Sequence, residues 1–221
     1  MKARFLAMVL CLAVPGATVF GQEAGPYIMS GSKALLFNFN GFNAGTFFAN
    51  GIGGKMFVSD AVAIRAALQF ATVSESIPYD IPDATGNDGT ESATMLGIAG
   101  GLEYHFTQTR ISPYLGGEVR FSTTSTSAEA AEPSGTPQTT VDNSVDGVLG
   151  FNGGLTFGVA ALAGVEFFIA RGVSLGAEYQ LGWQLTSLYD ETEGGTTVVK
   201  QGSTSAFGFS SGGGLTVSVY F

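Results

Sequence analysis

Apolar residues occupy every second position along much of this chain. From Val173 to Leu185, and again from Val62 to Phe70, apolar residues alternate with small or polar ones. A period of two is that of a β-strand, whose side chains point alternately to opposite faces of the sheet. The pattern predicts eight strands, at residues 32–41, 44–58, 61–74, 93–107, 111–124, 154–170, 173–187 and 205–221.

The connections between these segments alternate in length. Short turns are predicted at 59–60, 107–110 and 171–172 and long polar connections at 75–92, 125–153 and 188–204, while the first connection, 40–43, is also short. The strands are long enough for the roughly 9 to 11 residues that a tilted strand needs to cross a bilayer. Short turns at one rim and long polar loops at the other are typical of membrane barrels. The sequence therefore predicts an all-β fold, an eight-stranded antiparallel transmembrane β-barrel with an up-and-down meander.

Aromatic residues on the apolar faces fall at two levels. Phe106, Phe167 and Phe221 lie next to the short turns, and Phe70, Phe121, Trp183 and Phe207 lie further along their strands. Two aromatic girdles about one bilayer apart are expected of a membrane barrel. In the alternative fold, a soluble β-sandwich, the same rings would share an internal core.

The first 21 residues are organised like a secretory signal peptide. Two basic residues precede an apolar run from Phe5 to Val14, and small or tolerated residues then stand at Val19 and Gly21. The apolar run is too short to cross a bilayer as a helix, and the order of the regions predicts cleavage after Gly21. Lipid attachment at Cys11 is not expected, because Leu10 precedes it where a lipoprotein signal has a small residue.

Charge and cysteine content narrow the choice of partners and chemistry. The chain has nine Lys and Arg against eighteen Asp and Glu, and removal of the predicted signal peptide leaves seven against eighteen, a net charge of −11. An acidic chain of this kind argues against nucleic acid as a partner. The single Cys lies in the signal peptide, so the mature chain is expected to lack disulfides and thiol ligands.

The polar faces of the strands carry charges of both signs. By the alternation, the inward positions hold Lys55, Arg65, Glu103, His105, Glu118, Arg120, Glu166 and Glu178. Eight strands enclose a space just wide enough to be filled by side chains, and an unpaired charge in that space is costly. We therefore expect these residues to pair in a structural polar network that fills the lumen. A gated proton or ion path and an active site are the alternatives.

The residue content does not favour catalysis. His105 is the only His, so a multi-His metal site is excluded, and a Ser–His–acid triad would depend on this one residue near a short turn. The run Gly51–Lys55 lacks the spacing and the following Ser or Thr of a phosphate-binding loop. We expect no enzyme activity, no cofactor, and neither catalytic nor metal-binding residues.

The long connections are acidic. Together they contain twelve Asp and Glu and one base, Lys200. In residues 75–92, oxygen ligands of the kind that Ca²⁺ or Mg²⁺ binds are offered by Asp80, Asp83, Asn87, Asp88 and Glu91. Their spacing does not match an EF-hand loop. We expect a solvated acidic loop, with binding of a divalent cation as the alternative.

The C-terminal residues carry the most specific signal. Every second residue from Leu215 to Phe221 is apolar, and this aromatic ending resembles the last strand of bacterial outer-membrane barrels. Taken with the signal peptide, the eight strands and the one-sided loops, the chain resembles the small eight-stranded outer-membrane β-barrel family typified by OmpX and the transmembrane domain of OmpA. The resemblance covers residues 32–221, and the segments 98–106 and 111–119 also resemble generic outer-membrane barrels.

The resemblance implies a location, regions and partners. The location is the bacterial outer membrane with both termini periplasmic, and the regions are a signal peptide (1–21), a short N-terminal periplasmic segment (22–31) and the barrel (32–221). Implied partners are outer-membrane lipid and lipopolysaccharide, the barrel-assembly machinery through the C-terminal strand, and another outer-membrane protein or a surface ligand.

The resemblance also implies a non-catalytic role. The protein would be a surface or scaffold protein, an adhesin or an accessory subunit, acting through its acidic outer loops or its outer wall. A narrow channel for small hydrophobic or ionic solutes, as in OmpW, is one alternative. A lipid A-modifying enzyme is another.

Overall fold

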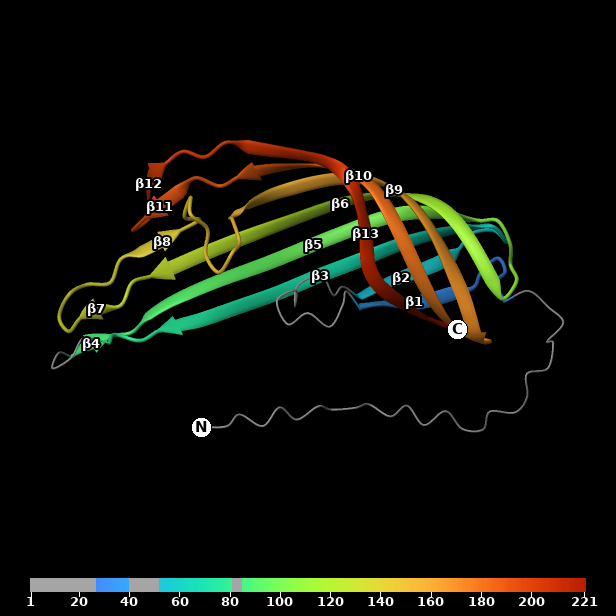
Figure 1. The fold of residues 1–221 in the computed structure, drawn as a ribbon, viewed down its shortest axis with the longest axis horizontal. Coiled ribbons are helices and arrows are strands. Elements are labelled where there is room, and N and C mark those ends of the chain that lie inside the picture. Colours follow the sequence, from blue (N-terminus) through green and yellow to red (C-terminus); the bar gives the residue numbers. More distant parts are fainter. Residues whose placement is uncertain (1–26, 40–51, 81–84) are drawn as a thin grey trace.

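The computed structural model of the chain describes residues 27–39, 52–80 and 85–221, and the regular structure in these ranges is β (Figure 1). The longer strands are β1 (Lys33–Phe39), β2 (Ile52–Phe57), β3 (Val62–Ile77), β5 (Gly89–His105), β6 (Ile111–Glu129), β9 (Gly154–Ala170), β10 (Val173–Leu188) and β13 (Ser203–Tyr220). Short strands are β4 (Gly86–Asn87), β7 (Glu132–Pro133), β8 (Thr140–Asp142), β11 (Glu191–Glu193) and β12 (Thr196–Val199). The described part of the chain contains no helix long and apolar enough to span a membrane.

The eight longer strands close into a ring. Their order is β1, β2, β3, β5, β6, β9, β10 and β13, and every neighbouring pair is antiparallel. β13 then pairs with β1, with Ala34 opposite Tyr220 and Phe37 opposite Val217. Closure removes the free edges that an open sheet would expose along these residues. The all-β antiparallel meander predicted from the sequence is confirmed.

The predicted strand limits hold best at the short-turn end. At the opposite end several strands run further than predicted, since β3 continues to Ile77, β5 begins at Gly89 and β6 continues to Glu129. The predicted strand 44–58 is described only from Ile52 onward, and the predicted turn 40–43 lies outside the described residues.

The long connections are more ordered than predicted. β6, β8, β11 and β12 pair in succession and continue one side of the barrel outward as a projecting sheet, while β4 pairs with β7 (Figure 1). The segments 75–92, 125–153 and 188–204, predicted as long polar connections, therefore contain short strands and the outer ends of long ones. These segments show no apolar alternation, but the neighbouring strands offer partners for their backbone N–H and C=O groups.

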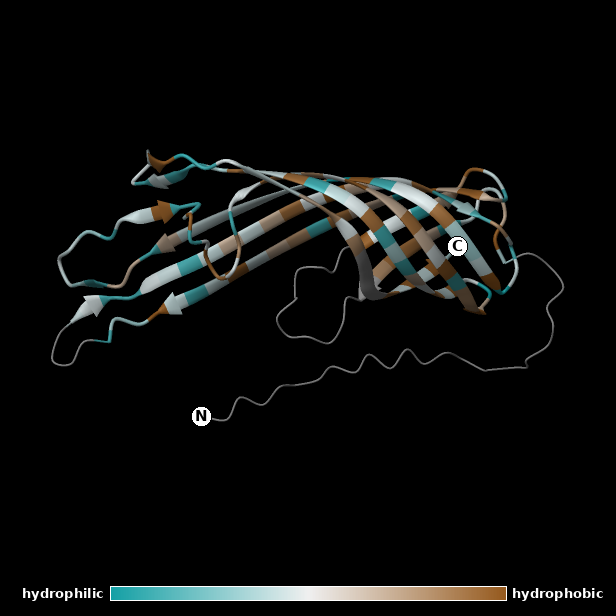
Figure 2. Cartoon of the chain, turned by 45° about the horizontal axis from the view of Figure 1, so that its top comes forward, coloured by the Kyte–Doolittle hydropathy of each residue, from teal (hydrophilic) through white to brown (hydrophobic). Residues whose placement is uncertain are grey.

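The barrel wall has two different faces. Along β5, the even-numbered residues from Thr94 to Tyr104 are exposed, and the odd-numbered residues from Ala93 to His105 are buried or half-buried. Hydrophobic residues recur along the barrel strands in Figure 2, and many large ones are exposed, Leu102 by 54% and Phe70 by 68%. The wall therefore presents its apolar side chains outward and its polar side chains to the lumen.

The seven predicted girdle residues all have exposed side chains: Phe70, Phe106, Phe121, Phe167, Trp183, Phe207 and Phe221. Phe157, which the prediction omitted, connects two of them, because its ring centroid lies 4.9 Å from that of Phe121 and 6.2 Å from that of Trp183. Trp183 in turn lies opposite Phe207. A band of aromatic rings thus crosses the outer face of β6, β9, β10 and β13.

A small apolar core closes the short-turn end of the barrel. Ile28, Phe57, Ala63 and Phe168 are each at most 1% exposed, and Tyr27 and Tyr220 pack against them. Ile28 belongs to the segment predicted only as a short N-terminal extension. The structure places it inside the mouth of the barrel.

Candidate functional site

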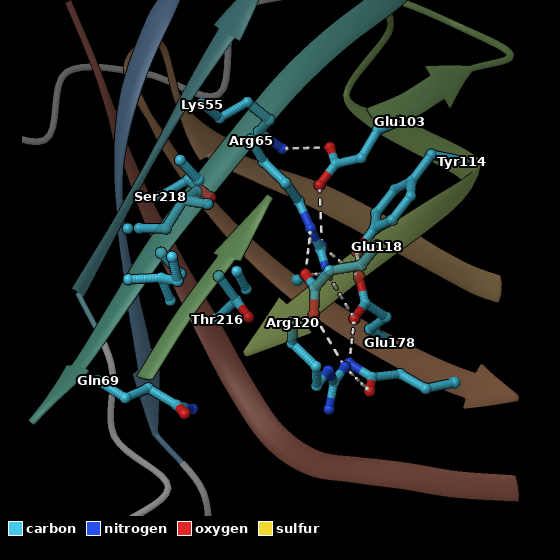
Figure 3. Close-up of a pocket in the computed structure, with 18 of the residues that line it drawn as sticks. Lys55, Arg65, Gln69, Glu103, Tyr114, Glu118, Arg120, Glu178, Thr216 and Ser218 are labelled. Carbon is cyan, nitrogen blue, oxygen red and sulfur yellow. Dashed lines mark hydrogen bonds and ion pairs between the residues drawn. The ribbon is translucent and has the colours of Figure 1, made fainter. Parts of the chain in front are cut away.

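The eight titratable residues assigned to the lumen by alternation meet inside the barrel. They are Lys55 of β2, Arg65 of β3, Glu103 and His105 of β5, Glu118 and Arg120 of β6, Glu166 of β9 and Glu178 of β10. Ion pairs and hydrogen bonds join all eight in one network, which we call the lumen network. Figure 3 shows its central part, around Arg65.

Arg65 is the centre of the lumen network. Its Nε lies 2.9 Å from a carboxylate oxygen of Glu118, and its Nη2 donates to the same carboxylate. Its Nη1 lies 3.1 Å from Glu103 and 2.6 Å from Glu178. The planar guanidinium can donate five hydrogen bonds in a fixed arrangement. One side chain of β3 therefore ties together β5, β6 and β10.

Lys55 holds a second pair of carboxylates. Its Nζ lies 3.0 Å from Glu103 and 3.1 Å from Glu166, and the residue is 6% exposed. The rings of Phe57, Tyr114 and Tyr220 also surround the ammonium group, with their centroids 5.8, 5.8 and 6.0 Å away. A buried ammonium group is costly unless it is paired, and here two carboxylates and three aromatic faces compensate it.

Hydroxyl groups that the sequence prediction did not include complete the lumen network. Tyr220 donates to Glu166 at 2.7 Å, and Ser174 donates to the same carboxylate oxygen. Tyr114 donates to Glu178 at 2.9 Å. The alternation already placed these residues on inward faces, so the signal for their inclusion was present in the sequence.

A glycine allows Tyr114 to reach its partner. Tyr114 lies opposite Gly164 on β9. A Cβ at position 164 would lie 2.4 Å from the Cζ of the Tyr114 ring, so any larger residue there would displace the ring. The absence of a side chain at Gly164 therefore leaves the space in which Tyr114 reaches Glu178.

His105 is fully buried beside the apolar core. Its Nε2 lies 3.0 Å from Glu103 and its Nδ1 lies 2.8 Å from the Oγ of Ser112. Its ring centroid is 4.9 Å from that of Phe57 and 5.0 Å from that of Tyr114. Both ring nitrogens are thus engaged and the ring is packed between two others, which is the environment of a structural histidine.

Arg120 is the most open cation of the lumen network. Its Nη2 donates to Glu118 at 2.8 Å and to Gln180 at 2.6 Å, and its side chain is 40% exposed. It borders a cavity of about 340 Å³ that extends from the lumen network to Gln69 and Ser122, further from the short turns (Figure 3). A smaller adjoining cavity of about 230 Å³ also meets Arg120. The open space of the lumen therefore lies on the long-loop side of the network.

The lumen network is saturated with internal contacts. Both oxygens of each of its four glutamates have a partner among the described residues. A carboxylate engaged in this way is poorly placed to take up a substrate proton. The chemistry that the arrangement supports best is cross-linking of the barrel strands by charge-assisted hydrogen bonds.

The acidic connection 75–92 offers no assembled metal site in its described part. The Asp88 carboxylate accepts a hydrogen bond from the backbone N–H of Tyr79 at 3.0 Å, and Asp83 lies outside the described residues. Across the described chain, no group of three or more His, Cys, Asp or Glu side chains is placed to hold a metal ion.

No protein-family model matches the chain, and the similarities to known proteins are limited. The crystal structure of Neisserial surface protein A is similar with a TM-score of 0.31 and 17% identity, over 86% of this chain and 94% of that one. Ammonium transporters of Mycobacterium bovis and Mycobacterium tuberculosis are 36% identical over 87 residues. That match covers 39% of this chain and spans only 16% of each transporter. Neither similarity assigns a family or an activity.

Proposed function

We propose that the protein is an integral outer-membrane barrel that acts as a binding scaffold. In this proposal, lipid and lipopolysaccharide surround the apolar wall, and the lumen network is structural. The long connections face the outside and both termini are periplasmic. The barrel-assembly machinery would recognise the C-terminal strand, β13.

The construction of the lumen supports a scaffold over a channel or an enzyme. Between the cavity and the short-turn rim lie two successive layers, the lumen network and the apolar core around Phe57 and Phe168. An ion or solute would have to displace both layers to pass. The saturated carboxylates and the buried His105 likewise leave little for a substrate to engage.

The observation that carries the binding role is the projecting sheet. β12 is the last strand in its order, and in the described residues no strand pairs with its other edge. All four residues of β12, Thr196–Val199, are β-branched and exposed, Val198 by 49% and Val199 by 40%. A free edge without Pro, Lys or Glu in the strand itself can accept an extended segment of another protein as an additional strand.

Charge indicates the chemistry of that partner. The carboxylates of Asp190 and Glu191 accept hydrogen bonds from the backbone N–H groups of Gln201 and Val145, at 3.0 and 2.8 Å, so these neutral donors leave their charge uncancelled. Glu193 adds a third acid beside β12, against one base, Lys200, directly after the strand. The edge therefore favours an extended basic segment, and a second copy of this chain would bring the same negative charge and be repelled.

A peptide-binding experiment tests this function. The purified barrel in detergent micelles is titrated with a labelled peptide of alternating Lys and Val, and with its Glu and Val counterpart, by fluorescence anisotropy. We expect the basic peptide to bind, more weakly as salt is added, and the acidic peptide not to bind.

Two Lys substitutions separate binding at the edge from general attraction. Val198→Lys places a charge on β12 and should abolish binding, because Lys on an edge strand opposes strand addition. Val58→Lys adds the same charge at a position that is 48% exposed outside any strand, in the short turn between β2 and β3, and should retain most of the binding. If both variants lost peptide binding equally, the binding would be non-specific electrostatic attraction. If neither variant changed peptide binding, the peptide would bind at a site other than β12.

A further inference from the structure

The chain preceding β1 crosses the short-turn mouth of the barrel. The turn between β5 and β6 lies nearly opposite β1 in the ring, because β2 and β3 separate β1 from β5 on one side and β13, β10 and β9 separate it from β6 on the other. The backbone N–H of Tyr27 donates to the carbonyl oxygen of Gln108 in that turn at 2.8 Å. Residues 27–32 therefore span the mouth from rim to rim.

Few hydrogen bonds fasten this segment to the barrel. Besides the contact of Tyr27 with Gln108, the N–H of Ser30 donates to Asp60 Oδ1 at 2.9 Å. The N–H of Gly31 donates to the carbonyl oxygen of Phe57 at 2.8 Å, and the N–H of Phe57 donates to that of Ser32 at 2.9 Å. Gly31 has a φ of +88°, a backbone conformation that Gly adopts readily and that lets the chain turn into β1. The attachments lie on two of the short turns and at the end of β2.

One side chain of the segment fills the mouth. Ile28 is 0% exposed and packs with Phe57, Ala63 and Phe168, whereas the next residue, Met29, is 53% exposed. The Tyr27 ring covers Phe168, with 5.1 Å between the ring centroids. Phe57 in turn contacts His105 of the lumen network. Ile28 is thus the outermost layer above the charged lumen.

We propose that residues 27–32 are a closing strap, which opens and reseats at the short-turn mouth while the barrel wall stays folded. The wall is held by continuous ladders of backbone hydrogen bonds between its strands, whereas residues 27–31 belong to no strand. Release of the strap breaks the contacts described above and leaves the strand ladders in place, and local openings of this kind cost less than global unfolding. Its seating therefore controls access to the lumen network from this end.

Thiol labelling tests the strap directly. Cys11 is the only Cys of the chain, so Cys11→Ser allows single cysteines to be introduced by Ile28→Cys and, as the matched control, Met29→Cys. The purified barrel in detergent micelles is reacted with a water-soluble maleimide. We expect Met29→Cys to react at the rate of a free thiol and Ile28→Cys at least about tenfold more slowly, because it reacts only from the open strap.

A second substitution separates opening of the strap from unfolding of the barrel. Asp60→Ala removes the acceptor for Ser30 and should raise the labelling rate of Ile28→Cys several-fold, while the heat-modifiable electrophoretic shift of the folded barrel is retained. Equal rates for positions 28 and 29 without Asp60→Ala would show that the mouth is not closed. If Ile28→Cys reacts only under conditions that unfold the whole barrel, with or without Asp60→Ala, residues 27–32 are a fixed part of the core and the proposal is overturned.

Discussion

Arg65→Ala is expected to lower the free energy of unfolding of the barrel by about 3–5 kcal/mol, the range seen when one partner of a buried ion pair is removed. The substitution takes the shared cation away from Glu103, Glu118 and Glu178. Those carboxylates would remain in a narrow lumen with fewer partners, and their mutual repulsion would add to the desolvation cost. Urea titration of the barrel refolded in lipid vesicles, followed by the fluorescence of Trp183, measures the change.

Arg120→Ala is the matched control for this prediction. Arg120 belongs to the same network and carries the same charge, but its side chain is 40% exposed, compared with 13% for Arg65. Water can replace much of the hydrogen bonding that Arg120 gives to Glu118 and Gln180. We therefore expect the free energy of unfolding to fall by no more than about 1 kcal/mol. If the two alanine variants were equally stable, the lumen network would not hold the barrel together in the way proposed.

Leu102→Arg is expected to cost about 2–4 kcal/mol, the penalty for Arg on the lipid face of a barrel near the bilayer midplane. Leu102 is 54% exposed on the outer face of β5. It lies four residues from Phe106 at one aromatic level and four residues from Ile98, the register partner of Phe121 at the other. A guanidinium there would have to leave water for hydrocarbon. The same urea titration in vesicles reports the cost.

Val198→Arg is the control that shows whether the side chain at position 102 faces lipid or water. Val198 is 49% exposed, almost the same as Leu102, but it lies on β12 in the projecting sheet. There Arg would remain in water, and the expected change in unfolding free energy lies within about 0.5 kcal/mol. Similar small effects at both positions would mean that the wall around Leu102 does not face lipid.

The barrel itself was predictable because its two faces meet different surroundings. Apolar residues such as Leu102 and Ile64 point outward, while their sequence neighbours Glu103 and Arg65 point into a lumen that requires paired charges. This difference imposes a strict period of two on the sequence. The same alternation was enough to predict that Arg65, Glu118 and Glu178 all point into the lumen, although the sequence gives no distances between them.

The projecting sheet and the strap could not be predicted in this way. Residues 125–129 show no apolar alternation, although the structure continues β6 through them and pairs them with β8. Ile28 lies between Tyr27 and Met29 in a short segment without periodicity, so the sequence does not single it out. Its position in the barrel mouth depends on Phe57, Ala63 and Phe168, which come from three different strands. Only the tertiary fold brings these three residues together.

The measurement that tests the central claim most directly uses the only Trp of the chain, Trp183. Its side chain lies in the outer band of aromatic rings and is 38% exposed. The barrel is refolded into vesicles whose lipids carry bromine either near the headgroup or deep in the acyl chains, and the fluorescence is compared with that in the presence of aqueous iodide. If the wall faces lipid, lipids brominated near the headgroup should quench Trp183 most strongly, deeply brominated lipids less, and iodide little. Strong quenching by iodide with none by either brominated lipid would contradict a membrane-spanning barrel.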